Sequence, residues 1–309
     1  FIWQKGSLSL HMTDSSKQTL RTLIQTSNPA ALLAAAAAHM LGASAAVYLG
    51  FPIRWDLFGW SLLFVLNLHL FTQWIPAALH PPAGSYLLLK KRPPQTDAAS
   101  RMLIHASFIT VAFLGTALAG FLLSGGIPLI SWLALGALLA FSLLYAFYLR
   151  LRTSGAGEIW QALIIAVLIP GFSFSLMTGD LHRLIPMSTT ALAAFWFSGT
   201  IVSQLKTYAR DTIREQHNLT TRFGWRRAMF LHDAGLEFAV FTMILAYLFG
   251  YPTRISASLL IVLPLVITQI IHMRRIRRGG PPRLRLMEWT AAAIFFLTIY
   301  LQIIGFLSY

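Results

Sequence analysis

The acidic side chains that could do chemistry are quickly found, because the 309-residue chain has only ten of them. Asp211 and Glu215 lie four residues apart in a polar stretch, a spacing that puts both on one face of a helix. Two carboxylates on one open face suit Mg²⁺, which takes oxygen ligands and keeps waters for a phosphate. We therefore predict that Asp211 and Glu215 are the metal-binding and catalytic residues. The alternative is an interfacial helix whose charges pair with one another.

Cations gather around this pair and in a second stretch earlier in the chain. Carboxylates together with several cations suit a diphosphate that is bridged by a metal ion, because the cations offset the remaining phosphate charge. The predicted diphosphate-binding residues are Lys90, Lys91, Arg92, Lys206, Arg210 and Arg214.

Polar residues also interrupt apolar stretches. Asn67, His69 and Gln73 lie in one such stretch, where they either line a cavity or form hydrogen bonds between helices. Asp233 and Glu237 lie in another, and carboxylates at such positions are functional sites or partners of arginine near a helix end.

The elements that position these residues are transmembrane helices. The chain is 56% hydrophobic and only 11% charged, which leaves too few charges to cover a surface that faces water. A helix needs about 20 mostly apolar residues to cross the hydrocarbon core. Nine stretches meet this need, so we predict an all-α integral membrane protein with nine transmembrane helices around a central cavity. The predicted spans are 29–50, 57–79, 102–124, 127–149, 159–178, 186–205, 229–250, 255–273 and 287–307.

The net charge of +14 is explained by membrane orientation and an anionic substrate rather than by nucleic acid. The connections between spans alternate between the two sides of the membrane. Of the lysines and arginines from Met12 onward, one side has only Arg54, Arg183 and Arg254, and the other side has all the rest. The positive-inside rule then predicts a cytoplasmic N-terminus and an external C-terminus, in a cell (inner) membrane.

The predicted organisation is a single membrane domain over 29–309, preceded by a cytoplasmic segment, 13–28. We expect residues 1–12 to be a remnant of cloning. Two connections on the basic side are long, near 80–101 and 206–228, and long loops in a compact protein are usually functional. The sequence predicts nothing about oligomeric state.

This arrangement resembles the UbiA superfamily of intramembrane prenyltransferases, whose active loops follow spans 2 and 6. The similar stretches are Lys91-Arg92-Pro93-Pro94, Gly157-Glu158, and Arg210-Asp211-Thr212-Ile213-Arg214-Glu215 followed by Leu219 to Ala228. The last resembles the family's second Asp-rich motif, with Glu215 in place of its second Asp. The resemblance implies Mg²⁺, an isoprenoid diphosphate and a hydrophobic acceptor within the bilayer.

The chain departs from the family pattern at the first Asp-rich motif, which should end span 2. No Asp or Glu occurs between Asp56 and Asp97, so the carboxylates that this motif supplies for Mg²⁺ are missing. Three functions stay open. The first is transfer of a prenyl group from a diphosphate to an aromatic or lipid acceptor. The second is a UbiA-type terpene cyclase that acts by protonation or ionisation of an isoprenoid. The third is a non-catalytic lipid-binding or transport protein.

Overall fold

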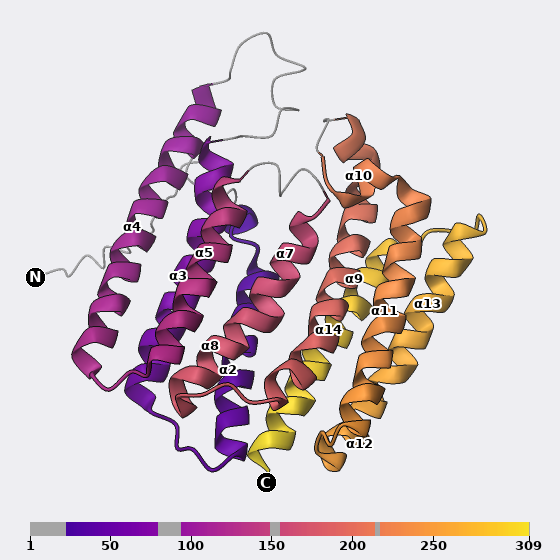
Figure 1. Cartoon of the computed structure of the whole chain (residues 1–309). Helices are drawn as coiled ribbons and strands as arrows, with labels where there is room; N and C mark the ends of the chain where they lie inside the picture. The colour runs from indigo at the N-terminus through magenta and orange to yellow at the C-terminus, as the bar shows by residue number, and fades with distance from the viewer. Residues whose placement is uncertain (1–22, 80–93, 149–154, 214–216, 309) are drawn as a thin grey trace, which may run out of the picture.

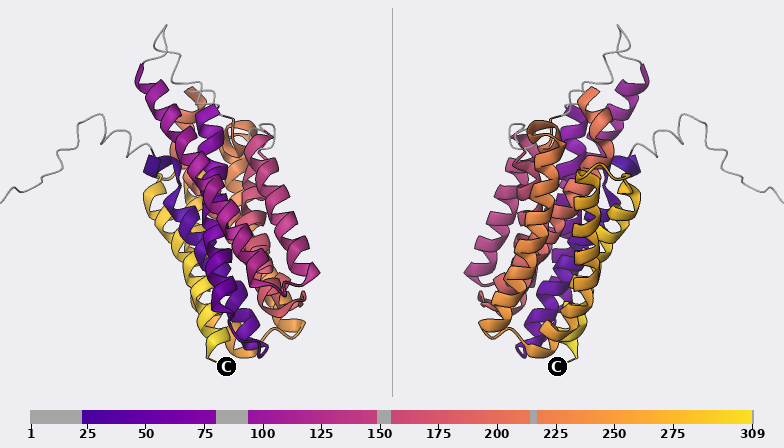
Figure 2. Two further views of the ribbon diagram at one scale, coloured as in Figure 1. Left: turned by 90° about the vertical axis from the view of Figure 1, so that its left-hand side faces the viewer. Right: turned by 90° about the vertical axis from the view of Figure 1, so that its right-hand side faces the viewer.

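The computed structural model describes residues 23–79, 94–148, 155–213 and 217–308. Within these ranges nine helices are long and apolar enough to cross a membrane, which confirms the predicted all-α membrane architecture. The helices run side by side along one common direction in both views of Figure 2. The predicted segment 1–12 and most of 13–28 lie outside the described residues.

The first half of the bundle consists of α2 (Pro29–Tyr48), α3 (Trp55–Leu79), α4 (Pro94–Ser124) and α5 (Leu129–Phe147). Its centre is α2, which packs against α3, α8 and α14. Seven of the first ten residues of α2 are alanine, and such small side chains let helices approach closely where lipid provides no hydrophobic drive for association. The buried His39 ring also shares a hydrogen bond with Ser61 of α3, with 3.0 Å between His39 Nε2 and Ser61 Oγ.

The fifth span changes its helical type at its middle. It comprises α7 (Gly157–Leu163), a π-helical segment η2 (Ile164–Leu168) and α8 (Ile169–Thr178). Pro170 has no N–H to donate to the preceding turn, which explains why a wider turn forms just before it.

Three of the remaining spans are single helices: α9 (Leu184–Ile213), α11 (Trp225–Leu248) and α14 (Leu284–Leu307). The span between α11 and α14 is broken into α12 (Thr253–Leu259), the 3₁₀ turn η3 (Leu260–Val262) and α13 (Leu263–Arg277). A short helix, α10 (Leu219–Phe223), lies between α9 and α11. Figure 1 shows α10 at the upper end of the bundle and the C-terminus at the lower end.

The two stretches predicted as long loops are more helical than expected. α9 continues past the predicted end of its span to Ile213, and α4 already begins at Pro94. The stretch 206–228 also holds α10 and the start of α11, so its prediction as a loop is wrong for most of its described residues. Hydropathy marks the part of a helix that lies in hydrocarbon, whereas a helix of 30 residues is about 45 Å long and extends into the polar region.

The crossing of α2 and α8 yields a stability prediction. A Cβ atom on Gly42 would lie 2.2 Å from the backbone oxygen of Pro170, so Gly42→Ala forces the two helices apart. We expect a loss of about 1–3 kcal/mol of stability, in line with other overpacked cores. Gly136→Ala is the matched control, because a Cβ there meets nothing within 4 Å. Thermal unfolding in detergent measures both variants, and equal melting temperatures would contradict this account of the crossing.

Candidate active site

Asp211 lies in the last turn of α9, at the upper end of the bundle, and only 5% of its surface is exposed. Its Oδ2 accepts hydrogen bonds from the Thr207 hydroxyl at 2.6 Å and from the Asn218 side-chain amide at 3.2 Å. Its Oδ1 is buried and has no hydrogen-bond partner among the described residues, although Arg210 Nε lies 3.5 Å away. One carboxylate oxygen is therefore held by two hydrogen bonds, while the other has only the Arg210 guanidinium beside it.

Asn218 is positioned by its own role as a helix cap. Its side chain accepts from Thr221 N at 2.9 Å, and Thr221 Oγ1 accepts from Asn218 N at 2.9 Å. This reciprocal capping box starts α10, and Gly224, with φ of 79°, allows the turn into α11. The sequence therefore folds back at this point so that the Asn218 amide meets Asp211.

A second buried carboxylate ties three helices together close to Asp211. Glu158 of α7 is 5% exposed, and its Oε1 accepts hydrogen bonds from the side-chain amide of Gln204 on α9 and from Leu219 N at 3.1 Å. Thr220 N in turn donates to Gln204 Oε1 at 3.4 Å. The other oxygen of Glu158 is buried without a hydrogen-bond partner in the described part of the chain. Glu158 thus fixes α10 against α7 and α9.

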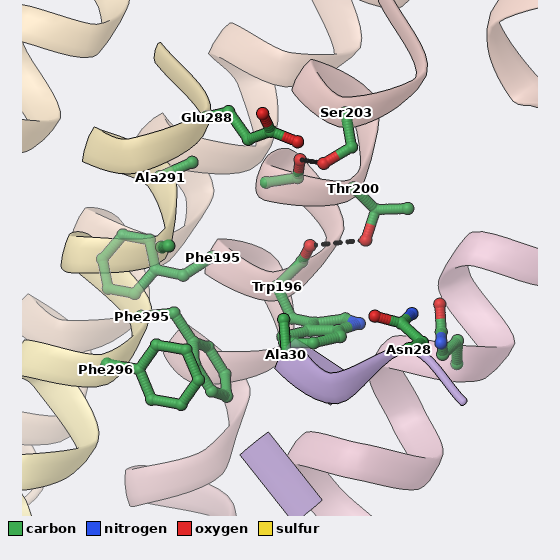
Figure 3. A pocket seen from close by; sticks show the side chains of 13 residues that line it. Asn28, Ala30, Phe195, Trp196, Thr200, Ser203, Glu288, Ala291, Phe295 and Phe296 are labelled. Carbon is green, nitrogen blue, oxygen red and sulfur yellow. Dashed lines mark hydrogen bonds between the residues drawn. The ribbon is translucent and has the colours of Figure 1, made fainter. Parts of the chain in front are cut away.

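A cavity of about 360 Å³ opens below these residues, between α7, α9, α14 and the start of α2. Phe195, Phe295 and Phe296 form its apolar part, as Figure 3 shows. Its polar wall includes Gln161, one turn along α7 from Glu158. The volume falls in the range of small-molecule sites, which is about 300–1,000 Å³.

One face of α9 joins this cavity to Asp211. Thr200 and Ser203 line the cavity, and Thr207 and Asp211 follow at helical spacing on the same face. At 1.5 Å per residue, Asp211 lies about 12 Å along the helix from Ser203. A substrate with a charged end near Asp211 and an apolar body in the cavity matches this distance.

Asp211 has one feature that suits a Mg²⁺ ligand, a carboxylate oxygen without a hydrogen bond among the described residues. Mg²⁺ is usually bound through one or two carboxylates plus substrate phosphates and waters, and Oδ1 of Asp211 is a buried carboxylate oxygen without a hydrogen-bond partner. The described residues contain no group of three or more His, Cys, Asp or Glu side chains that would hold a metal ion by themselves. Most ligands of such an ion would therefore come from substrate and water. Glu215, the second predicted ligand, lies outside the described residues.

The structure describes only two of the six residues that are predicted to bind the diphosphate, Lys206 and Arg210. Lys206 Nζ lies 2.5 Å from Glu288 Oε2 on α14, at the rim of the cavity. Arg210 is largely exposed and lies beside Asp211. Lys90, Lys91, Arg92 and Arg214 lie outside the described residues, so their roles stay predictions.

The three polar residues predicted to line a cavity lie on α3. Asn67 donates its side-chain amide to the backbone oxygen of Leu63 at 2.8 Å, and His69 is buried. The lining of the 360 Å³ cavity includes neither of these nor Gln73. Their role as cavity lining stays a prediction.

The carboxylates of α11 have arginine partners from α13. Glu237 accepts from Arg274 at 2.6 Å, and the buried Asp233 lies 3.4 Å from Arg277 and 3.7 Å from Arg274. Asp233 also contacts the ring of His232 at 3.1 Å. This pairing agrees with the second of the two interpretations of Asp233 and Glu237, so we assign this cluster to the packing of α11 on α13.

Sequence reasoning gave Glu158 too little weight and did not identify the residues that line the cavity. Glu158 appeared only as part of a Gly-Glu pair, and its partners lie 46 and 61 residues away in the chain. The cavity residues come from four separate helices, and no spacing in the sequence connects them.

The fold and this site together define a helical intramembrane protein with a polar carboxylate site at one end of the bundle. No protein-family model matches the chain, and no curated protein matches its sequence.

Solved structures do match it. The structure of a digeranylgeranylglyceryl phosphate synthase in membranes has a TM-score of 0.66 at 13% identity, covering 94% of this chain and all of that one. A UbiA homologue from Archaeoglobus fulgidus, bound to GPP and Mg²⁺, has a TM-score of 0.62 at 18% identity, covering 93% and 100%. A UbiA homologue from Aeropyrum pernix K1 has a TM-score of 0.64 at 13% identity, covering 88% and 97%. The chain therefore has the UbiA fold, and the resemblance seen in the sequence is confirmed at the level of the fold.

Proposed function

We propose that this chain is a divergent UbiA superfamily enzyme that transfers a prenyl group from an isoprenoid diphosphate to an aromatic or lipid acceptor within the bilayer. The observation that carries the proposal is the buried carboxylate of Asp211, whose Oδ1 has no hydrogen-bond partner among the described residues, at the head of a helix face that leads down to an apolar cavity. The fold supports it, because UbiA homologues of the same fold have been solved with GPP or DMAPP and Mg²⁺.

Each part of the site has a proposed task. Arg210, together with the basic residues near 90–92, binds the diphosphate, and Asp211 and Glu215 would hold Mg²⁺ against it. Bound Mg²⁺ would neutralise negative charge that develops on the departing diphosphate. The aromatic wall formed by Phe195, Phe295 and Phe296 holds the isoprenoid chain and keeps water from the allylic carbon. The acceptor oxygen or carbon then forms the new bond as the carbon–oxygen bond to diphosphate breaks, and the proton that the acceptor loses passes to the released diphosphate or to water.

One observation favours a terpene cyclase as the second candidate. The chain has no acid between Asp56 and Asp97, where a prenyltransferase of this family would supply carboxylates for Mg²⁺. A cyclase that starts by protonating an alkene needs a buried carboxylic acid instead, and Glu158 and Asp211 are both buried. Aromatic faces in the cavity would stabilise the resulting cation.

A single assay separates these functions. Purified protein is incubated with geranyl, farnesyl or geranylgeranyl diphosphate, with or without extracted membrane lipids as acceptors, in Mg²⁺ or in EDTA. We expect pyrophosphate release that requires both Mg²⁺ and acceptor. A cyclised product that forms without acceptor would favour the cyclase, whereas no turnover of any isoprenoid would contradict both proposals.

A further inference from the structure

Glu288 of α14 is the one ionisable side chain among the described residues that line the cavity of about 360 Å³. The other lining residues are aromatic, small, or polar and neutral. The Glu288 side chain is 35% exposed, so a molecule in the cavity can reach its carboxylate. In Figure 3, Glu288 and Ser203 lie toward one end of the cavity, and Phe295 and Phe296 lie toward the other. The cavity therefore has an acidic end and an apolar end.

Along α9, Glu288 lies between the candidate diphosphate site and the aromatic wall. Its Oε2 is 2.5 Å from Lys206 Nζ, and Lys206 is five residues from Asp211, about 7.5 Å along the helix. Phe195 is eleven residues from Lys206 in the other direction, about 16 Å along the axis. In the proposed reaction, the bond that breaks joins the diphosphate to the apolar chain. Glu288 is therefore at the level where the acceptor has to lie.

The hydroxyl groups on the facing side of α9 can accept a hydrogen bond from a ligand but have no hydrogen left to donate. Thr200 Oγ1 donates to the Trp196 backbone oxygen at 2.9 Å, and Ser203 Oγ donates to the Gly199 backbone oxygen at 3.4 Å. Each hydroxyl has a single hydrogen, so it offers the cavity its lone pairs. The carboxylate of Glu288 also accepts and does not donate. This end of the cavity therefore suits a ligand that donates a hydrogen bond.

The charge of Glu288 is balanced from outside the cavity. Lys206 pairs with its Oε2 but does not line the cavity, whereas its Oε1 has no hydrogen-bond partner among the described residues. Asn28 and Gln161 complete the polar lining and are neutral. A carboxylate group on a ligand would face a like charge here, with no cation in the described lining to offset the repulsion. The lining thus disfavours anionic ligands.

We propose that Glu288 selects the acceptor, and that the part of the acceptor inside the cavity is uncharged and carries a hydroxyl group, which donates a hydrogen bond to Glu288 Oε1. A protonated amine would also be attracted to Glu288, but it has no lone pair with which to form the new bond. The acceptor is therefore a neutral phenol or a neutral lipid alcohol rather than an aromatic acid or a fatty acid. This inference rests on the proposed prenyl transfer.

The test compares acceptors that differ in charge but keep the same hydroxyl group. One pair is para-hydroxybenzamide and para-hydroxybenzoate, and the other is methyl ricinoleate and ricinoleate, each with geranyl diphosphate and Mg²⁺. We expect kcat/KM for the uncharged member to exceed that for the anion by at least about tenfold, because like charges that face one another are disfavoured. The pair that is turned over identifies the acceptor as a phenol or a lipid. Equal values within the pair that is turned over would overturn the selection by Glu288.

Three variants separate acceptor selection from a structural role of the ion pair. Glu288→Gln keeps the size of the side chain but removes its charge, so the tenfold preference should fall to about one. Lys206→Gln breaks the same ion pair between α9 and α14 but keeps the acid, so the preference should persist. Glu288→Asp should also keep it. Equal loss of the preference in Glu288→Gln and Lys206→Gln would assign the pair to helix packing and contradict the proposal.

A binding measurement distinguishes failure of this inference from failure of the proposed function. The thermal unfolding midpoint of the purified full chain is measured with each acceptor, without the diphosphate. We expect the uncharged member of a pair to raise the midpoint and the anion to leave it unchanged. This result without turnover would reject prenyl transfer but keep the selection. A midpoint that moves equally with both members, or with none of the four compounds, would overturn the selection whether or not prenyl transfer occurs.

Discussion

Asp211→Asn is expected to lower Mg²⁺-dependent pyrophosphate release by at least about 100-fold, the usual scale for removing a group that stabilises developing charge. Asparagine has nearly the shape of aspartate, and its carbonyl oxygen can still accept from Thr207 and Asn218. It lacks the negative charge, however, and cannot present a second carboxylate oxygen to a metal ion. The measurement is turnover of an isoprenoid diphosphate at saturating Mg²⁺, together with the thermal unfolding midpoint.

The control for this substitution is Asp56→Asn. Asp56 lies in the first turn of α3, at the other end of the bundle, where its side chain is 52% exposed and 3.7 Å from Arg54. We expect that variant to retain full turnover. Asp211→Asn with unchanged turnover and an unchanged melting temperature would remove Asp211 from the site. It would also remove the main support for prenyl transfer in this chain.

The transmembrane architecture was predictable because it follows from local composition. Each span is a run of apolar residues as long as the hydrocarbon core is thick, and this requirement acts on every helix separately. The helix ends were less predictable. Lys206 and Arg210 are polar, so they were assigned to a loop, yet they continue α9 beyond the hydrocarbon region. Hydropathy reports the solvent around a residue, and the backbone hydrogen bonds that define a helix continue past that boundary.

The candidate site was predictable only where its residues are close in sequence. Asp211 was singled out from its charged neighbours and its spacing to Glu215, and its role stays a prediction. Asn218 was not singled out, because its contact with Asp211 depends on the turn that its own capping box makes. The cavity needed the packing of α7 and α14 against α9, which follows from side-chain shapes along whole helices. A single sequence has no local signal for such contacts.

Glu158→Ala is expected to lower both stability and turnover, unlike Asp211→Asn, which should lower turnover alone. The substitution removes the acceptor of Leu219 N, and Leu219 is 2% exposed. A buried donor left without a partner costs about 1–3 kcal/mol, and the Gln204 amide loses its acceptor as well. Thermal unfolding and pyrophosphate release, measured on the same preparation, test this expectation.

Turnover should fall because α10 positions the neighbour of Asp211. Leu219 follows Asn218 directly, so release of Leu219 N lets the Asn218 amide move away from Asp211 Oδ2. Glu158→Gln separates this positioning role from a role of the charge itself, since its carbonyl oxygen still accepts from Leu219 N. We expect Glu158→Gln to recover most of the melting temperature and most of the turnover. If Glu158→Gln recovers stability but not turnover, the charge of Glu158 takes part in the chemistry. If Glu158→Ala leaves the melting temperature unchanged, the hydrogen bonds of Glu158 do not hold α10 in place.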